Sequence, residues 1–361
     1  TATTEIYTLS LHDALPTSAG TKDILQLAPA ITWSGEYTQC ARTLDFGLLS
    51  SPTDTNIPAI DCPLGAGVTL ALDDMELFSG FIVSRTKSTE SSVIDITAFD
   101  RGFYIKRNKA SYQFKGTTPE DITRRICADF GIETGYIAQT GVKISRSFVA
   151  TTLYHIIQTA YTLASRETGE KYLVRFEGSK LSVVKVGAEG AVALIAGESN
   201  LMSASTTESI ENMINQVQIV SKEGTVRDTV RDESLIRLYG LLQEQIRSVD
   251  GEDMRAEAKR LIENNGVIQR ITVHNLGDVH CVAGNAVAVE EPYTGLAGLF
   301  YIENDTHTWK NGQYYNKLVL NYRRMMDEKE AGAVISAAKK KVSGQSVSGS
   351  PWQYLYKPGE G

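Results

Sequence analysis

Two pairs of adjacent carboxylates are the residues of this 361-residue sequence best suited to hydrolytic chemistry: Glu290 with Glu291, and Asp73 with Asp74. Hydrolases that use two carboxylates employ one as a general acid and the other as a base or nucleophile, and such pairs can leave no local motif. Both pairs lie where turns are predicted, however, and acids at turn positions are ordinarily solvated. We therefore expect neither pair to be catalytic.

A small group of histidines and one cysteine could bind a metal. His274 and His280 are six positions apart with Cys281 next to them, but no further ligands follow at the spacing typical of zinc sites. His155 lies beside the apolar face of a predicted helix, and His307 lies at a predicted strand end, where we expect a structural hydrogen bond rather than a catalytic base. We expect no metal site.

Local signatures of other enzyme classes do not occur. The sequence has no phosphate-binding G-x-x-x-x-G-K-S/T, dinucleotide-binding G-x-G-x-x-G, metalloprotease H-E-x-x-H or nucleophile-elbow G-x-S-x-G. The triplet at Asn304, Asp305 and Thr306 matches a glycosylation acceptor, which a cytoplasmic protein would not use. The sequence thus predicts no enzyme, no catalytic residue, no cofactor and no bound metal.

Composition narrows the class of partner. The net charge is −7, from 36 basic and 43 acidic residues that are interspersed, so no surface for sequence-specific nucleic-acid binding is expected. No apolar run is long enough to cross a membrane, and no signal peptide is recognised. The four cysteines form no C-x-x-C pair, so we expect reduced, buried thiols in a soluble cytoplasmic product. They are Cys40, Cys62, Cys127 and Cys281.

An antiparallel meander with one buried face is predicted between residues 65 and 108. Val68, Leu70 and Leu72 alternate with polar or small residues, which is the period of a half-buried strand. Gly80 lies inside the next strand, where glycine commonly marks a bulge or a close backbone approach. The three strands are expected at 68–72, 76–85 and 94–98.

The second half of the sequence resembles this meander. From Gly284 onward, Val287 and Val289 correspond to the first alternating positions, and Gly298 corresponds to Gly80. Similarity at a fixed offset indicates an internal repeat, although all half-buried meanders share alternation and could look alike by chance. We predict a duplicated small β-barrel module.

Helical signals lie between the two copies. Thr118 can cap a helix and Pro119 suits its first position. A second helix is predicted to begin near Thr152, with apolar residues three and four positions apart, and to end at Gly169. We assign both helices to a small helical insert at residues 117–168.

The rest of the second half is mostly β with one helix. Ala258, Leu261 and Ile262 share one face of this helix, and Gly266 ends it. The other elements are strands, expected at 172–176, 181–186, 192–195, 213–221, 234–246 and 267–273.

The predicted fold is mainly β with α insertions (α+β), with two duplicated tube-like β-barrel modules and a small helical insert. The first module covers residues 21–116, the insert covers 117–168, and the second module with its inserted helix covers 169–326. Residues 1–20 fit neither module. The run 7–16 looks like translated sequencing-adapter DNA, so we expect a non-native or disordered extension.

Residues 327–361 form a predicted C-terminal tail. Charged and alanine-rich residues 327–342 are expected to be helical, and a Ser/Gly linker follows. Trp352, Tyr354 and Tyr356 alternate beyond it, a spacing that could add a strand to a partner or could belong to a disordered end.

Short strand motifs resemble a known family. They lie at 67–70, 76–82, 96–101, 215–217, 239–243 and 298–302, with His307, Trp309, Asn311 and Gly312. These motifs resemble baseplate hub proteins of contractile phage tails and phage-tail-like particles, especially the prophage and tailocin hub branch. Late-control-D proteins and the hub part of type VI secretion spikes are similar. The resemblance covers residues 22–325.

The resemblance implies a structural, non-enzymatic role. Hubs of this type are homotrimers in which each chain gives two tube-like modules, so three chains present a pseudo-sixfold ring to the sixfold tail tube and remain threefold toward the spike. The implied partners are the tail tube protein, the spike protein, other baseplate proteins and the tape-measure protein. The implied location is the virion or tail-like particle, after synthesis in the bacterial cytoplasm.

Two other functions are compatible with a β-rich chain. A peptidoglycan-cleaving tail-associated hydrolase would use paired carboxylates and would clear cell wall in zymography. A carbohydrate-binding module would place exposed aromatic residues together on one strand face, and the sequence shows none outside the C-terminal tail.

Overall fold

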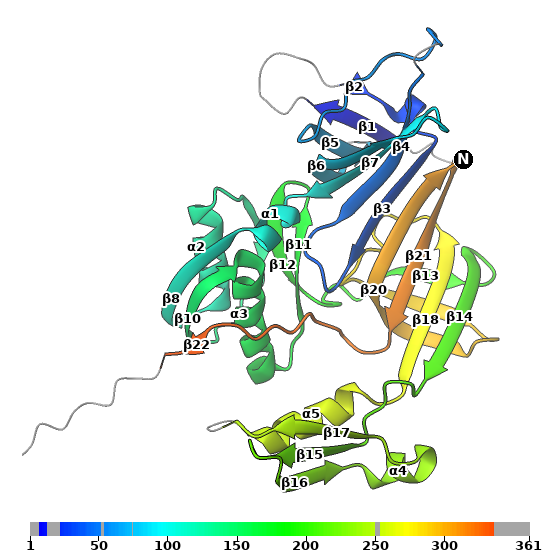
Figure 1. Cartoon of the computed structure of the whole chain (residues 1–361). Helices are drawn as coiled ribbons and strands as arrows, with labels where there is room; N and C mark the ends of the chain where they lie inside the picture. Colours follow the sequence, from blue (N-terminus) through cyan, green and yellow to red (C-terminus); the bar gives the residue numbers. More distant parts are fainter. Residues whose placement is uncertain (1–6, 13–21, 52–53, 74, 250–252, 336–361) are drawn as a thin grey trace, which may run out of the picture.

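The computed structural model describes residues 7–12, 22–51, 54–73, 75–249 and 253–335. Most described strands belong to one 13-stranded sheet, which curls through the upper and right-hand parts of Figure 1. Its strands are β1 (Tyr7–His12), β2 (Lys22–Asp23), β3 (Ala30–Glu36), β4 (Thr43–Leu49), β5 (Gly67–Leu72), β6 (Met75–Lys87), β7 (Val93–Asp100), β13 (Ala191–Ala196), β14 (Leu201–Ser209), β18 (Ile268–Leu276), β19 (Ala286–Glu291), β20 (Leu296–Lys310) and β21 (Gln313–Asn321). A 3-10 turn, η1 (Leu25–Leu27), follows β2.

Both predicted meanders form. β5, β6 and β7 pair antiparallel, and so do β19, β20 and β21. The alternating residues of the first meander are buried as their period predicts, with Val68 1% and Leu70 0% exposed. In the second meander, Val287 and Val289 are fully buried in the same way. The fold is therefore mainly β, as predicted.

The meanders extend into two units with the same strand order. The first unit is β3-β4-β7-β6-β5 and the second is β14-β18-β21-β20-β19, with all neighbours antiparallel. The register of β6 on β7 shifts between Ile82 and Ser84, and that of β20 on β21 shifts between Ile302 and Asn304. The two shifts therefore align Ser84 with Asn304.

This alignment corrects the predicted glycine equivalence. Val68 pairs with Gly80, whereas Val287 pairs with Phe300, and Gly298 lies two residues before that position. Gly80 is required by close packing, since a Cβ there would lie 2.3 Å from the carbonyl oxygen of Phe99. Gly298 has no such contact but adopts φ +133°, which favours glycine.

The two units are joined in one sheet. The C-terminal half of β20 pairs with β3 from Asn304 opposite Glu36 to Lys310 opposite Ala30. Figure 1 shows these strands, drawn orange and blue, side by side along the middle of the molecule. Neither unit closes into a barrel among the described strands, so the prediction of two separate barrel modules is not confirmed. We call the β3–β20 junction the seam.

Residues 7–12, which we excluded from the fold, form β1. All six pair antiparallel with β5, and Leu9 is fully buried against the core of the first unit. The prediction that residues 1–20 take no part in the fold is therefore wrong for Tyr7–His12. The alternation of Leu9 with its neighbours supplies the strand period that docks this segment.

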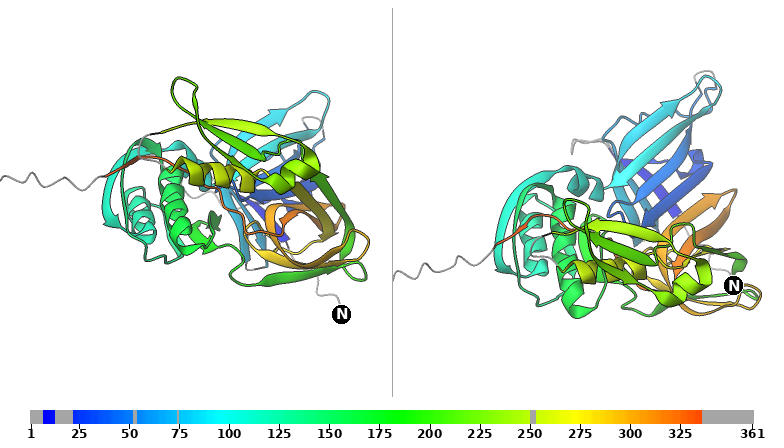
Figure 2. Two further views of the ribbon diagram at one scale, coloured as in Figure 1. Left: turned by 90° about the horizontal axis from the view of Figure 1, so that it is seen from below. Right: turned by 60° about the horizontal axis from the view of Figure 1, so that its bottom comes forward.

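An α/β body packs beside the first unit (Figure 2). It contains both predicted helices with their predicted N-caps, Thr118 and Thr152. It is larger than the predicted helical insert, because strands from both flanking regions join it around a shared apolar core. Its elements are α1 (Gly102–Arg107), β8 (Lys109–Thr117), α2 (Pro119–Asp129), β9 (Thr134–Ile137), β10 (Ile144–Thr152), α3 (Leu153–Thr168), β11 (Tyr172–Glu177), β12 (Lys180–Lys185) and β22 (Ala333–Val334).

A small α/β unit is inserted between β14 and β18, at the bottom of Figure 1. It consists of β15 (Gln216–Val220), β16 (Val226–Arg231), α4 (Glu233–Tyr239), β17 (Gln243–Arg247) and α5 (Met254–Asn264). The strand predicted for 234–246 is wrong over α4, because Asp232 caps the amides of Ser234 and Leu235 and starts a helix. The predicted helix α5 forms, but its C-cap is Asn265 rather than Gly266.

Residues 327–335 are extended rather than helical, contrary to the prediction. Tyr154 and Gln158 of α3 donate hydrogen bonds to the side chain and backbone oxygens of Asp327, and Gly332 has φ +74°. These contacts and the β22 pairing with β10 hold the segment against the body. The three C-terminal aromatic residues lie outside the described residues. No described helix is long and apolar enough to cross a membrane.

Candidate functional site

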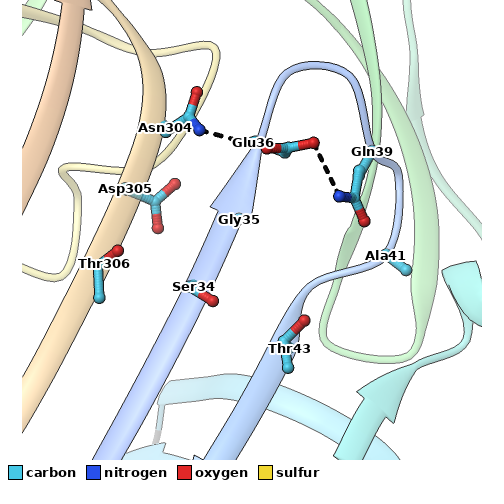
Figure 3. A pocket seen from close by; sticks show the side chains of 9 residues that line it. All are labelled: Ser34, Gly35, Glu36, Gln39, Ala41, Thr43, Asn304, Asp305 and Thr306. Atoms are coloured by element: carbon cyan, nitrogen blue, oxygen red, sulfur yellow. Dashed lines mark hydrogen bonds between the residues drawn. The ribbon is translucent and has the colours of Figure 1, made fainter.

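The seam brings together polar side chains from both halves of the sequence. β3 and the 37–42 link supply Trp33 and Arg42, and the second unit supplies Asp305, His307 and their neighbours. Figure 3 shows one edge of the seam, where Asn304 and Gln39 both donate to the Glu36 carboxylate. The seam therefore joins residues that lie more than 260 positions apart in the sequence, such as Asn304 and Glu36.

Arg42 and Asp305 form an ion pair inside the seam. Nη1 of Arg42 donates to Oδ1 of Asp305 at 3.1 Å, and Nη2 donates to Oδ2. The Asp305 side chain is fully buried, and the backbone amide of Ala283 also donates to it. Such two-pronged pairing satisfies both charges away from water. The Arg42 guanidinium also stacks 3.9 Å above the ring of Trp33.

His307 extends this network into the second unit. Its Nδ1 lies 2.8 Å from Nδ2 of Asn316 and 2.7 Å from the Tyr314 hydroxyl. Because the Asn316 amide donates to Nδ1, the neutral ring carries its proton on Nε2, which lies 3.2 Å from Asp305 Oδ2. The His307 ring also packs 4.6 Å from that of Trp33.

The electrostatics favour one charge state. Burial opposes ionisation of Asp305, but the Arg42 guanidinium and the His307 ring outweigh it and lower the pKa of Asp305 to about 2. Burial lowers the pKa of His307 by more than the Asp305 carboxylate raises it. Near neutral pH the seam therefore holds one ionised pair and a neutral histidine.

A shallow polar pocket of about 200 Å³ opens beside the ion pair. Figure 3 shows its lining side chains. They are Ser34, Gly35, Glu36, Gln39, Ala41, Thr43, Asn304, Asp305 and Thr306. Glu36 accepts hydrogen bonds from its neighbours, and Asp305 is engaged by Arg42, so neither carboxylate is poised as an acid or base toward the pocket. The arrangement is suited to holding strands together.

Glu290 and Glu291 of the first carboxylate pair are the last two residues of β19, so they lie before the turn rather than in it. Both oxygens of Glu291 accept hydrogen bonds from backbone amides of Tyr293 and Thr294, so this side chain caps the β19–β20 turn. The Thr294 hydrogen bonds lower the pKa of Glu291. Asp73 lies in the β5–β6 turn at φ +48°, and Asp74 lies outside the described residues.

The candidate metal ligands do not converge. His274 lies on β18 and His280 is exposed in the loop that follows it, while the neighbouring Cys281 is buried. His155 is exposed on α3. In the described part of the chain, no three His, Cys, Asp or Glu side chains gather as a metal site would require. All four cysteines are free and buried.

The sequence predicts a structural hydrogen bond at His307, but it singles out neither Arg42 nor Asp305 as a residue that needs a buried partner. Arg42 stood in no motif, and Asp305 was noticed only as the middle of a glycosylation triplet. The available signal was the alternation of buried Asp305 and His307 with partly exposed neighbours, which places both on the buried face of a strand. Polar residues at buried strand positions need partners, and this could have flagged both.

Comparison with known proteins decides the family. A model of the YqbQ-like family matches residues 31–321, which is most of the chain. The chain belongs to the YqbQ-like family. This YqbQ-like chain is also 24% identical to the phage-like element PBSX protein XkdQ of Bacillus subtilis, over 80% of this chain and 90% of XkdQ.

Solved structures share the fold of this YqbQ-like protein. The 43 kDa tail protein of prophage MuSo2 from Shewanella oneidensis aligns with a TM-score of 0.66 at 12% identity, over 87% of this chain and 98% of that one. A tail protein from Neisseria meningitidis aligns with a TM-score of 0.62 at 14% identity, covering 87% and 96%. A chain of a PdpA-VgrG complex aligns with a TM-score of 0.53 at 9% identity, covering 92% and 68%.

This YqbQ-like chain therefore shares its fold with the two prophage and bacterial tail proteins named above. Its homology to XkdQ and its fold agree with the hub-type resemblance of its strand motifs.

Proposed function

We propose that this YqbQ-like chain is a structural baseplate hub. In this proposal three chains form a homotrimeric, pseudo-sixfold ring that joins the sixfold tail tube to the threefold spike of a contractile phage tail or tail-like injection particle. The partners are the tube protein, the spike protein and other baseplate proteins. The chain has no catalytic role.

One observation carries the proposal: a single chain contains two units with the same five-strand order, joined along the seam. Three such chains supply six similar units around an axis that stays threefold, as a joint between sixfold and threefold parts requires. Closed rings are the usual form of homo-oligomers. The relatives' descriptions as phage-like element and prophage tail proteins support a place in such a particle.

The ring is tested by electron microscopy of the full chain, alone and mixed with the tail tube protein of the same particle. The proposal expects rings whose averaged views show six similar lobes, and side views in which the rings stack on tube ends. Particles that stay monomeric with the tube protein, or rings without six similar lobes, would overturn it.

A further inference from the structure

Two strand edges of the large sheet carry no partner in the described part of the chain. Beyond Ile82, β6 pairs with β7 on one side only, through Ser84 to Lys87. β14 pairs only with β18, along its whole length from Leu201 to Ser209. Exposed strand edges present unpaired amides and carbonyls that invite another strand, so proteins normally cover them.

The equivalent edges are covered inside the chain. β20 occupies in the second unit the position that β6 occupies in the first unit. Likewise, β3 occupies in the first unit the position that β14 occupies in the second unit. β20 and β3 pair with each other across the seam through seven residue pairs. The chain therefore contains one complete example of the contact that its two open edges could make.

The equivalence fixes a register. The matching shifts in β6 and β20 align Arg85 with Asp305 and Thr86 with Thr306. The register of β3 and β14 follows from the strands beside them. Ile31 of β3 pairs with Phe46 of β4, and Ala204 of β14 pairs with Val273 of β18. Phe46 and Val273 hold equivalent places in the two units, so Ile31 is equivalent to Ala204.

Ser34 lies three residues after Ile31, and Thr207 lies three residues after Ala204, so Thr207 is equivalent to Ser34. Thr306 pairs with Ser34 there, so the transferred register puts Thr86 opposite Thr207. The same register puts Arg85 opposite Glu208.

The side chains at these positions suit each other. Arg85 has 38% of its side chain exposed and Glu208 is exposed, so an opposite-charge pair would form directly across the strands. The β3–β20 seam within the chain also contains an ion pair, between Arg42 and Asp305. Among the described residues of its own chain, Arg85 makes a long 3.9 Å approach to Asp61 and donates a hydrogen bond to the Cys62 carbonyl.

We infer that the β6 edge of one copy pairs with the β14 edge of a second copy, in the register of the seam. The inference rests on the proposed function and names the contact that builds its ring. The two edges differ, so the contact is head-to-tail and leaves one free edge at each end until the ring closes. Around a trimer, the three β3–β20 seams within the chains would then alternate with three β6–β14 contacts between the chains.

Disulfide cross-linking tests the register. The variant Thr86→Cys with Thr207→Cys places thiols opposite each other across the contact, within reach of a disulfide. Both native residues are exposed, whereas the four native cysteines are buried. The matched control combines Thr86→Cys with Ser205→Cys, which shifts one thiol by two residues on the same face, to a diagonal position about 7–8 Å away.

Mild oxidation of the full-length Thr86/Thr207 variant is expected to give a covalent ladder that ends at the trimer. The Thr86/Ser205 control is expected to give at least tenfold less. Equal cross-linking of both variants, or none in either, would overturn the inference. A trimer by light scattering that does not cross-link would overturn the β6–β14 contact alone, whereas a chain that stays monomeric with its tube protein would overturn the proposed function.

Charge reversal provides an independent test. Arg85→Glu would place two negative charges across the contact and is expected to weaken trimer formation several-fold. Adding Glu208→Arg is expected to restore it, a rescue that local damage around Arg85 would not show. Failure of the second change to restore the trimer would contradict the register.

Discussion

Arg42 and Asp305 form a buried ion pair although 263 positions separate them in the sequence. The pair lies at the seam, where β3 of the first unit meets β20 of the second. Each partner also binds within its own half, since Arg42 stacks on Trp33 and Asp305 accepts from the Ala283 amide. This ion pair therefore links the two strand units, in addition to the backbone pairing of β3 with β20.

Removal of either charge should destabilise the chain strongly. Asp305→Asn leaves the Arg42 guanidinium buried without its counter-charge, and breaking a buried pair in this way costs about 3–5 kcal/mol of unfolding free energy. The double variant Arg42→Met with Asp305→Asn should recover part of this loss, because no unpaired charge remains. Urea denaturation measures both.

The matched control is the exposed pair of Arg125 and Asp129 on α2. Arg125→Met should change the unfolding free energy by less than about 1 kcal/mol, because solvent screens an exposed pair. An Asp305→Asn loss no larger than that of the control would contradict the structural role of the seam.

Asp100 should make stability fall as the pH rises from about 4 to about 7. Burial raises the pKa of Asp100 to about 7, against the hydrogen bonds it accepts from the Arg42 and Gly102 amides. In this window the folded carboxyl keeps its proton while the unfolded one, with a pKa of about 3.9, has lost it, so ionisation favours unfolding.

Asp100→Asn should flatten this part of the pH dependence, since the amide does not titrate. Urea denaturation at several pH values between 4 and 8 compares the slopes of the two proteins. A variant whose slope between these limits equals that of the parent would show that Asp100 is not the responsible group.

β1 should contribute to stability as a strand of the sheet. Leu9 is fully buried with Val68 and Leu70 in the core of the first unit, and burial losses of this kind cost about 2–5 kcal/mol for Leu→Ala. Thr8→Ala, at a partly exposed position of the same strand, should cost less than about 0.5 kcal/mol. Equal effects of the two substitutions in thermal denaturation would mean that β1 does not dock.

The chain should not degrade bacterial cell wall. Glu291, the last residue of β19, accepts hydrogen bonds from the Tyr293 and Thr294 amides of the turn that follows, which is the setting of a capping residue. Zymography on gels that contain peptidoglycan should show no clearing, with lysozyme as the positive control. If the chain cleared peptidoglycan and Glu291→Gln abolished the clearing, the alternative hypothesis of a tail-associated hydrolase would be supported instead.

The strands of both meanders could be predicted because period-two alternation is a local property, as Val68 and Leu70 illustrate. The helix caps at Thr118 and Thr152 were equally local. α4 was missed because its apolar residues suit a strand as well as a helix, and the Asp232 cap decides between them.

The seam could not be predicted in the same way. Pairing of β3 with β20 is non-local, and no pattern near Arg42 records the presence of Asp305. The predicted barrel modules, which are not confirmed, depend on strand pairing in the same way. Alternation identifies which face of a strand is buried, but it does not say which strand lies beside it, so one continuous sheet and two closed barrels share the same local pattern.

The mass of the purified full chain in solution, measured by light scattering with and without its tail tube protein, tests the hub proposal most directly. The proposal predicts a species of three times the 39.5 kDa of one chain. A mass that stays at one chain, or that settles at two or four, under both conditions would contradict a threefold ring of paired units.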